Sequence, residues 1–79
     1  MNYRFSKHAL ERIKERKIKK EWVLETLKNP DEIIEESYTE HRYYKVIKDF
    51  GNRTLKVVLN PESSIIITVY FDRGKKPWR

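Results

Sequence analysis

His8, Arg12 and Arg16 follow one another at steps of four residues near the start of this 79-residue chain. On a helix, residues four apart lie along one ridge, so all three side chains can reach the same anion. A guanidinium binds a phosphate through two parallel hydrogen bonds, and an imidazole exchanges protons near neutral pH. We therefore predict a catalytic site with His8 as general acid or base and both arginines as phosphate clamps. The alternative is that Glu11 and Glu15 pair with the arginines at the surface, or that Arg16 pairs with an acid of a sheet.

A second pattern combines cations with aromatic rings in residues 41–45, which read HRYYK. Alternate residues of a strand point to opposite faces, so His41, Tyr43 and Lys45 share one face and Arg42 and Tyr44 the other. Single-stranded RNA binds to such faces because its bases stack on rings while cations hold its backbone. The alternative is that tyrosines simply suit strands and that lysines protect sheet edges. The residues predicted to contact RNA are Arg42, Tyr44, Lys56, Tyr70 and Arg73.

The net charge of +6 is unevenly distributed along the chain. Residues 1–20 carry eight bases and two acids, residues 21–40 one base and seven acids, and residues 41–79 nine bases and three acids. Two basic segments around an acidic one favour a surface with a positive face and a polyanionic partner such as RNA. Residues 73–79 form a basic C-terminal tail that is either a phosphate contact or a solvated end. The alternative for the whole surface is a thermophile's ion-pair network, since 38% of residues are charged.

The composition excludes several other chemistries. The chain has no cysteine, so disulfides, thiolate zinc sites and thiol nucleophiles are excluded. Two histidines without an acid-rich loop predict no metal site, and the only glycines, Gly51 and Gly74, are too far apart for a phosphate loop. No cofactor is expected either. Metal-independent acid–base chemistry remains, and RNA suits it because the 2′-hydroxyl is an internal nucleophile.

The periodicity predicts an α+β fold in a single domain over residues 1–79: a short N-terminal strand, two helices, and then a three- to four-stranded antiparallel sheet. Ser6 is a good N-cap for the first helix, and Asn29-Pro30 ends the second. The apolar runs are far too short to cross a bilayer and the first residues do not resemble a signal peptide, so we expect a cytoplasmic protein. The predicted elements are a strand at 2–5, helices at about 6–17 and 21–28, and strands at 32–38, 41–50, 53–60 and 64–72.

The alternation also predicts which residues face the helices. Three sets are expected to pack together: Ala9, Leu10 and Ile13 of the first helix; Leu55, Val57 and Leu59; and Ile65, Ile67 and Val69. The opposite face of the sheet then carries Lys56, Val58, Thr68 and Tyr70.

The order Ser-x-His-Ala-x-x-Arg-x-x-x-Arg at residues 6–16 resembles a family of small bacterial and archaeal domains of unknown function. The segments 22–31 and 66–70 fit the same pattern, so the resemblance covers nearly the whole chain. One departure is Lys17, where the family often has glycine. That family is similar to the RelE/ParE superfamily of toxins, including the BrnT type, which implies a short strand, two helices and an antiparallel sheet.

The superfamily also implies a metal-independent endoribonuclease that often acts on ribosome-bound messenger RNA and is inhibited by a small antitoxin. Its ParE branch attacks gyrase instead, so resemblance to the fold is stronger than resemblance to the activity. A RelE-like toxin or toxin-derived ribonuclease is therefore the leading hypothesis. The alternatives are a non-catalytic RNA- or protein-binding module and a ParE-like inhibitor of a protein target. The sequence leaves open the oligomeric state, and whether the His8 ridge and the sheet face form one site.

Overall fold

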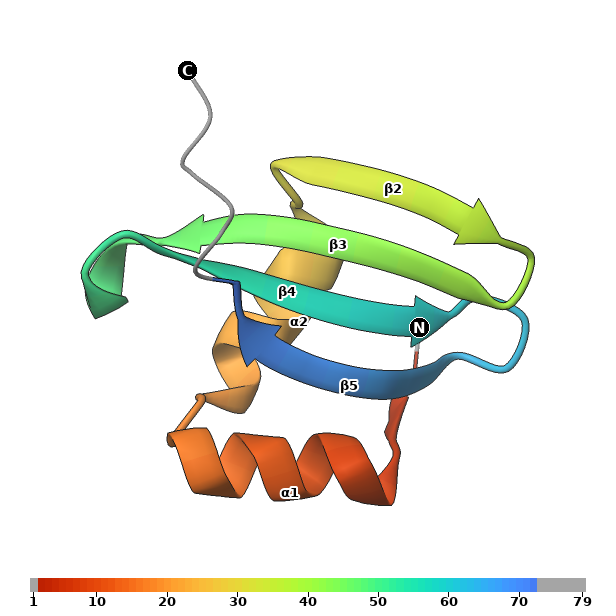
Figure 1. Cartoon of the computed structure of the whole chain (residues 1–79), viewed down its shortest axis with the longest axis horizontal. Coiled ribbons are helices and arrows are strands. Elements are labelled where there is room, and N and C mark those ends of the chain that lie inside the picture. The colour runs from red at the N-terminus through yellow and green to blue at the C-terminus, as the bar shows by residue number, and fades with distance from the viewer. Residues whose placement is uncertain (1, 73–79) are drawn as a thin grey trace.

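The computed structural model describes residues 2–72 and has the α+β fold that the periodicity predicts. Along the chain, the two helices follow the first strand and precede the other four strands of a five-stranded sheet (Figure 1). Arg73 and the basic tail lie outside the described residues. In chain order the elements are β1 (Arg4–Phe5), α1 (Lys7–Arg16), α2 (Lys20–Lys28), β2 (Glu32–Ser37), β3 (Glu40–Ile47), the 3-10 turn η1 (Lys48–Phe50), β4 (Arg53–Asn60) and β5 (Ile65–Phe71).

The sheet is mixed, in the order β1-β5-β4-β3-β2. Strands β2 to β5 form the expected antiparallel meander, but β1 joins the same sheet as a fifth strand parallel to β5. The pairing is short: the Arg4 amide donates to the Ser64 carbonyl at 3.0 Å, and the Ser6 amide to the Ile66 carbonyl at 3.0 Å. Parallel neighbours need a long crossover between them, and here the two helices and the meander supply it.

Ser6 caps α1 as predicted, and it also fastens the helix to the sheet. Its hydroxyl accepts a hydrogen bond from the Ala9 amide at 3.0 Å and donates one to the Ile67 carbonyl at 2.7 Å. At the other end, Lys17 adopts the left-handed conformation (φ 55°) that terminates many helices and that glycine adopts most easily. The helix therefore begins and ends close to the predicted residues.

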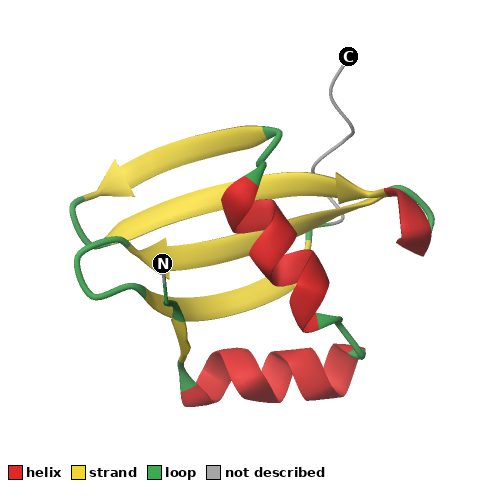
Figure 2. Ribbon diagram, turned by 180° about the vertical axis from the view of Figure 1, so that it is seen from behind, coloured by secondary structure: helices red, strands yellow, loops and turns green. Residues whose placement is uncertain are grey.

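Both helices lie on the same side of the sheet (Figure 2). Helix α2 crosses β3 and β4, and α1 packs along β5. The side chains buried between the layers are Ala9, Ile18, Val23, Leu27, Ile47, Leu55, Val57, Leu59, Ile66 and Val69. Leu10 was expected among them, but it is 43% exposed because it lies beyond the edge of the stripe that α1 turns toward the sheet.

A β-bulge changes which isoleucines of β5 face the helices. Val58 pairs with Thr68, but the next residue, Leu59, pairs with Ile66, so Ile67 is an extra residue on β5. One extra residue reverses the alternation beyond it. Ile66 is consequently buried, and the expected inward placement of Ile65 and Ile67 is wrong.

Strand β3 ends earlier than expected, at Ile47, and η1 follows it. The short turn brings Phe50 against Phe71, with ring centroids 4.9 Å apart, and against Trp22 at 5.4 Å. These rings close one end of the layer between helices and sheet. Phe50 thus acts in packing rather than in strand pairing.

Candidate nucleic-acid interface

Three of the predicted RNA-contacting residues form one cross-strand row on the sheet face opposite the helices. Tyr44 pairs with Lys56, and Lys56 pairs with Tyr70, so the row crosses β3, β4 and β5. The Lys56 ammonium lies 5.8 Å from the centre of the Tyr44 ring and 5.1 Å from that of Tyr70. A cation at this distance from a ring is attracted by the negative potential of its face. The row therefore positions one cation between two aromatic rings.

The environment of Lys56 keeps its charge despite burial. The residue is only 9% exposed, and burial by itself lowers its pKa. The hydrogen bond with Tyr70 and the electrostatic effects of Tyr70 and Tyr44 outweigh burial, so the pKa of Lys56 lies above its ordinary value. Lys56 is therefore a fixed positive charge over the whole physiological pH range.

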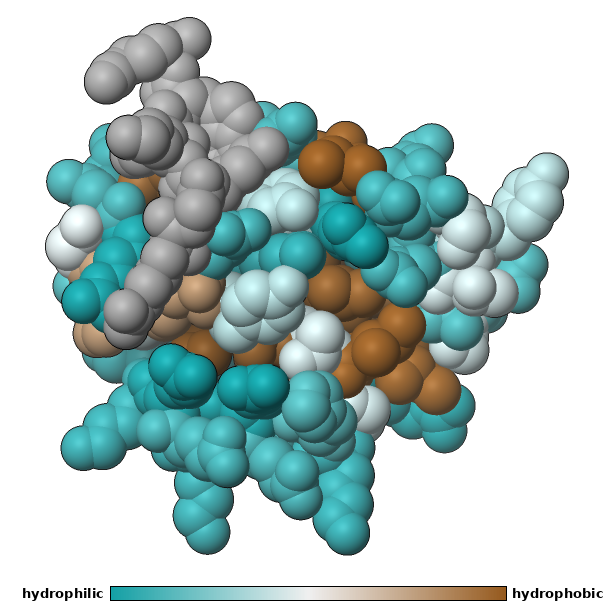
Figure 3. Space-filling model, in the orientation of Figure 1, coloured by the Kyte–Doolittle hydropathy of each residue, from teal (hydrophilic) through white to brown (hydrophobic). Residues whose placement is uncertain are grey.

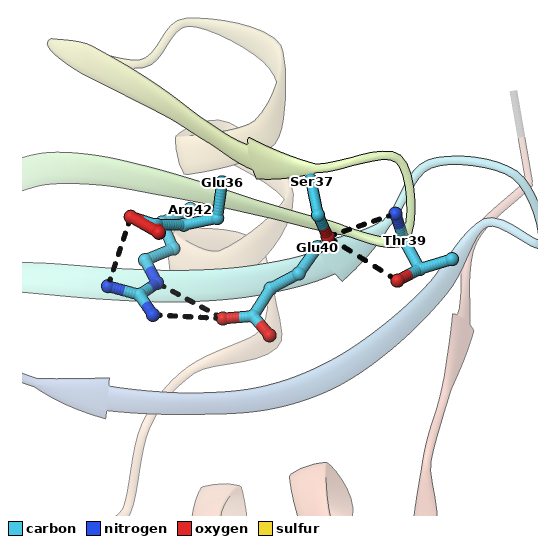
Figure 4. A network of polar contacts seen from close by, with 5 residues as sticks. All are labelled: Glu36, Ser37, Thr39, Glu40 and Arg42. Atoms are coloured by element: carbon cyan, nitrogen blue, oxygen red, sulfur yellow. Dashed lines mark hydrogen bonds and ion pairs between the residues drawn. The ribbon is translucent and has the colours of Figure 1, made fainter.

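Arg42 lies on the same face, in the neighbouring row, and is held by two carboxylates (Figure 4). Its Nε and Nη2 donate to Glu40 Oε2 at 3.1 and 3.0 Å, and its Nη1 lies 3.6 Å from Glu36 Oε1. The hydrogen bond to Glu40 raises the pKa of Arg42 above its ordinary value. These acids fix the guanidinium in place, and they also offset its charge.

Sequence reasoning did not assign partners to Arg42. The nearest signal was Glu40, two residues away and hence on the same side of the strand. Glu36 reaches Arg42 from β2, which is visible only once the β2–β3 pairing is known.

The members of the interface differ in accessibility. Tyr44 is 4% exposed and its ring lies against Lys56, whereas Tyr70 is half-buried. The Arg42 side chain is 33% exposed. On this face, apolar patches lie among polar side chains, and polar side chains form the lower border in the view of Figure 3. Tyr70 and Arg42 are therefore the members that an arriving ligand meets first.

The His8 ridge is present on α1 as the spacing predicts. Arg12 Nε donates a long hydrogen bond to His8 Nε2 at 3.5 Å, which is the sole polar contact of either side chain with the described residues. Arg16 is exposed, and neither arginine forms an ion pair with any residue between 2 and 72. The alternative of ion pairs with Glu11 and Glu15, or with an acid of the sheet, is therefore wrong for this structure.

The ridge and the cross-strand row belong to different layers. Helix α1 lies along the β5 border of the sheet, while the row runs from β3 to β5 across the opposite face (Figure 1). In residues 2–72, no hydrogen bond, ion pair or ring contact joins His8, Arg12 or Arg16 to a residue of that row. The structure thus presents two separate sets of candidate residues.

Among residues 2–72, no three His, Cys, Asp or Glu side chains converge in a way that would hold a metal ion. No helix in the same residues has the length and apolar character needed to span a membrane.

The fold and the interface together define a small α+β domain with a cation–aromatic row on its uncovered sheet face. The family model described as "Domain of unknown function (DUF4258)" matches residues 5–71, and the chain belongs to this family. The match begins at β1 and ends with β5, so it includes both candidate sets. No curated protein and no solved structure matches the chain significantly. The link to the RelE/ParE superfamily accordingly stays a prediction from sequence.

Proposed function

We propose that this domain binds single-stranded RNA on the sheet face opposite its helices. The observation that carries the proposal is the row of Tyr44, Lys56 and Tyr70, with the Lys56 ammonium between two rings. Base stacking needs an accessible ring, and Tyr70 supplies one. Backbone binding needs a fixed cation nearby, and Lys56 and Arg42 supply that. The net charge of +6 draws a polyanion to the domain before these contacts form.

Single-stranded RNA fits this face better than a duplex does. A duplex hides its bases, so proteins read it through its phosphates and 2′-hydroxyls along an extended path. Here the cations lie beside rings on the open face of a sheet, which suits unstacked bases. Arg42 also has Glu40 and Glu36 as acceptors close by, and these can receive hydrogen bonds from base amino groups.

The test is equilibrium binding of a fluorescent twelve-nucleotide RNA of mixed sequence, measured by anisotropy over a range of salt concentrations. We expect the logarithm of the association constant to fall linearly with the logarithm of the salt concentration. For a single strand, the slope should be about −0.7 for each phosphate contact. A duplex of the same sequence is the control and should bind more weakly. Equal binding of duplex and single strand, or no binding at low salt, would overturn the proposal.

A second candidate function is RNA cleavage by the α1 ridge, in keeping with the RelE-like toxin and the small antitoxin partner that the resemblance implies. The contact between His8 and Arg12 favours it, because a proton-transfer group and a phosphate-binding group lie side by side. Arg16, one turn further along, is an exposed second cation without an acidic partner among residues 2–72.

Cleavage is tested by incubating RNA with the purified protein in chelator and comparing His8→Ala with a Lys7→Ala control on the same exposed turn. Cleavage by the wild type and by the control, but not by His8→Ala, would support the second candidate. Intact RNA after prolonged incubation with a protein that binds it would reject cleavage and leave the binding function in place.

A further inference from the structure

One end of the molecule gathers cations on aromatic rings outside the row described above. Lys19 Nζ lies 5.5 Å from the centre of the Trp22 ring, Trp22 lies 5.4 Å from Phe50, and the Arg53 guanidinium lies 5.1 Å from Phe50. These four residues, which we call the cation–aromatic end, come from the α1–α2 connection, α2, η1 and β4. In Figure 1 the α1–α2 connection and η1 lie toward the same end of the sheet.

The two cations at this end differ from Arg42 in having no acidic partner. Lys19 and Arg53 are exposed, and neither forms an ion pair with any residue between 2 and 72. The rings orient their side chains without neutralising them. Neither charge is therefore taken up by an ion pair within residues 2–72, although Asp49 lines the same surface depression as Arg53.

The surface beside Arg53 is hollowed. A shallow depression of about 300 Å³ is lined by Asp49, Phe50, Gly51 and Arg53. Gly51 has a left-handed backbone (φ 66°), and a Cβ atom added there would meet no atom within 4 Å. The depression is therefore open to solvent on the side of Gly51. The depression offers an approach to the Arg53 guanidinium and to the Phe50 ring.

The cation–aromatic end is close to the interface along the strands. Arg53 is three residues from Lys56 on β4, which at about 3.3 Å per residue is a separation of about 10 Å. On the neighbouring strand, Phe71 directly follows Tyr70. An extended RNA strand that crosses the row can therefore continue round this end of the sheet.

We propose that Lys19 and Arg53 bind backbone phosphates of the same RNA beyond the open face, so that the preferred ligand is a single strand longer than the row alone can hold. This inference rests on the proposed RNA-binding function. Longer strands gain affinity from the second contact, and strands of about four nucleotides, the lower end of the site sizes known for OB folds that bind single strands, do not reach it. The competing explanation is that the two cations merely shield the rings from water with their apolar stems.

The test compares Lys19→Gln/Arg53→Gln with Lys7→Gln/Lys28→Gln in binding to RNAs of four and twelve nucleotides. The control removes two exposed lysines at the opposite ends of the same helices, so the net charge changes equally. Thermal unfolding of both variants by circular dichroism checks that the fold is kept.

For the twelve-nucleotide RNA, the slope of the logarithm of the association constant against the logarithm of the salt concentration should decrease in magnitude by about 1.4, which is two contacts at about 0.7 each. The association constant in 0.1 M salt should fall about 25-fold. The control should keep the wild-type slope, and binding of the four-nucleotide RNA should change equally in both variants. Equal losses in the two variants with the longer RNA would overturn this inference while leaving the proposed function standing. A wild type that binds neither RNA would overturn both.

Discussion

Replacing Tyr70 with leucine removes the accessible ring of the cross-strand row and keeps an apolar side chain on β5. Leucine fills part of the same space beside Lys56, but it has no flat face on which a base can stack. Base–ring stacking is worth about 1–3 kcal/mol per base, so we expect the affinity for single-stranded RNA to fall about 5- to 150-fold. The Lys56 ammonium also loses one of its two rings, 5.1 Å away in the wild type.

The same substitution also lowers stability. Loss of the cation–ring contact and of the hydrogen bond between Tyr70 and Lys56 costs about 2–4 kcal/mol, which at about 4–8 °C per kcal/mol lowers the melting temperature by about 10–30 °C. The binding assay is therefore run below the melting temperature of the variant. Thermal unfolding followed by circular dichroism measures this shift.

Tyr38→Leu is the matched control because Tyr38 is 87% exposed and lies in the β2–β3 turn, away from the row. It should bind RNA as the wild type does in the anisotropy assay. Wild-type affinity in Tyr70→Leu, or an equal loss in both variants, would refute the reasoning that places the RNA on this face.

Three further predictions concern stability and are measured by urea unfolding. Ser6→Ala should lower the free energy of unfolding by about 1–3 kcal/mol, because it removes both the α1 cap and a hydrogen bond to the bulge; Ser63→Ala, in an exposed turn, should change it little, and equal effects would contradict the role of the cap. Lys17→Gly should raise the free energy of unfolding by up to about 1 kcal/mol, because glycine adopts the left-handed backbone there without strain, and a loss of stability would count against this explanation. Burial, followed by the effects of Tyr3 and Glu35, raises the pKa of Tyr43 above its ordinary value of 10.0. The stability that depends on its proton is present below that pH and is lost as the pH rises through the higher pKa of the folded state, so Tyr43→Phe should show a smaller decline between about pH 9 and pH 11; an identical decline would contradict the assignment.

Local signals in the sequence were sufficient to predict the helices. Ser6 is an N-cap with a hydroxyl, and Asn29-Pro30 stops α2, so both boundaries depend on residues close in the chain. Strand alternation also predicted that Arg42 and Tyr44 share a face of β3, and the apolar sets of β4 and β5 placed Lys56 and Tyr70 on the face away from the helices.

Features that depend on pairing between strands could not be predicted in the same way. The bulge at Ile67 leaves no mark in a run of three isoleucines, since each of them suits a buried position equally well. The early end of β3 has a similar cause: Phe50 fits a strand by propensity, but contact with Trp22 and Phe71 holds it in η1. Tertiary packing overrides the local preference at such positions.

The candidate site shows the same division. The spacing of His8, Arg12 and Arg16 correctly predicted a ridge, because it depends only on the helix. Other features of the site depend on neighbours distant in the chain. These are the ion pair between Arg42 and Glu36, the burial of Tyr44, and the contacts of Lys19 and Arg53 with aromatic rings. These contacts decide which cations remain available to a ligand, and only the structure reveals them.

Titration of ¹⁵N-labelled protein with the twelve-nucleotide RNA, followed by amide chemical shifts, tests the central claim most directly. RNA bound on the open sheet face should perturb the amides of Arg42, Lys56 and Tyr70 and their neighbours on β3, β4 and β5, with little change along α1 around His8. Perturbations confined to α1, or spectra that stay unchanged at saturating RNA, would contradict it.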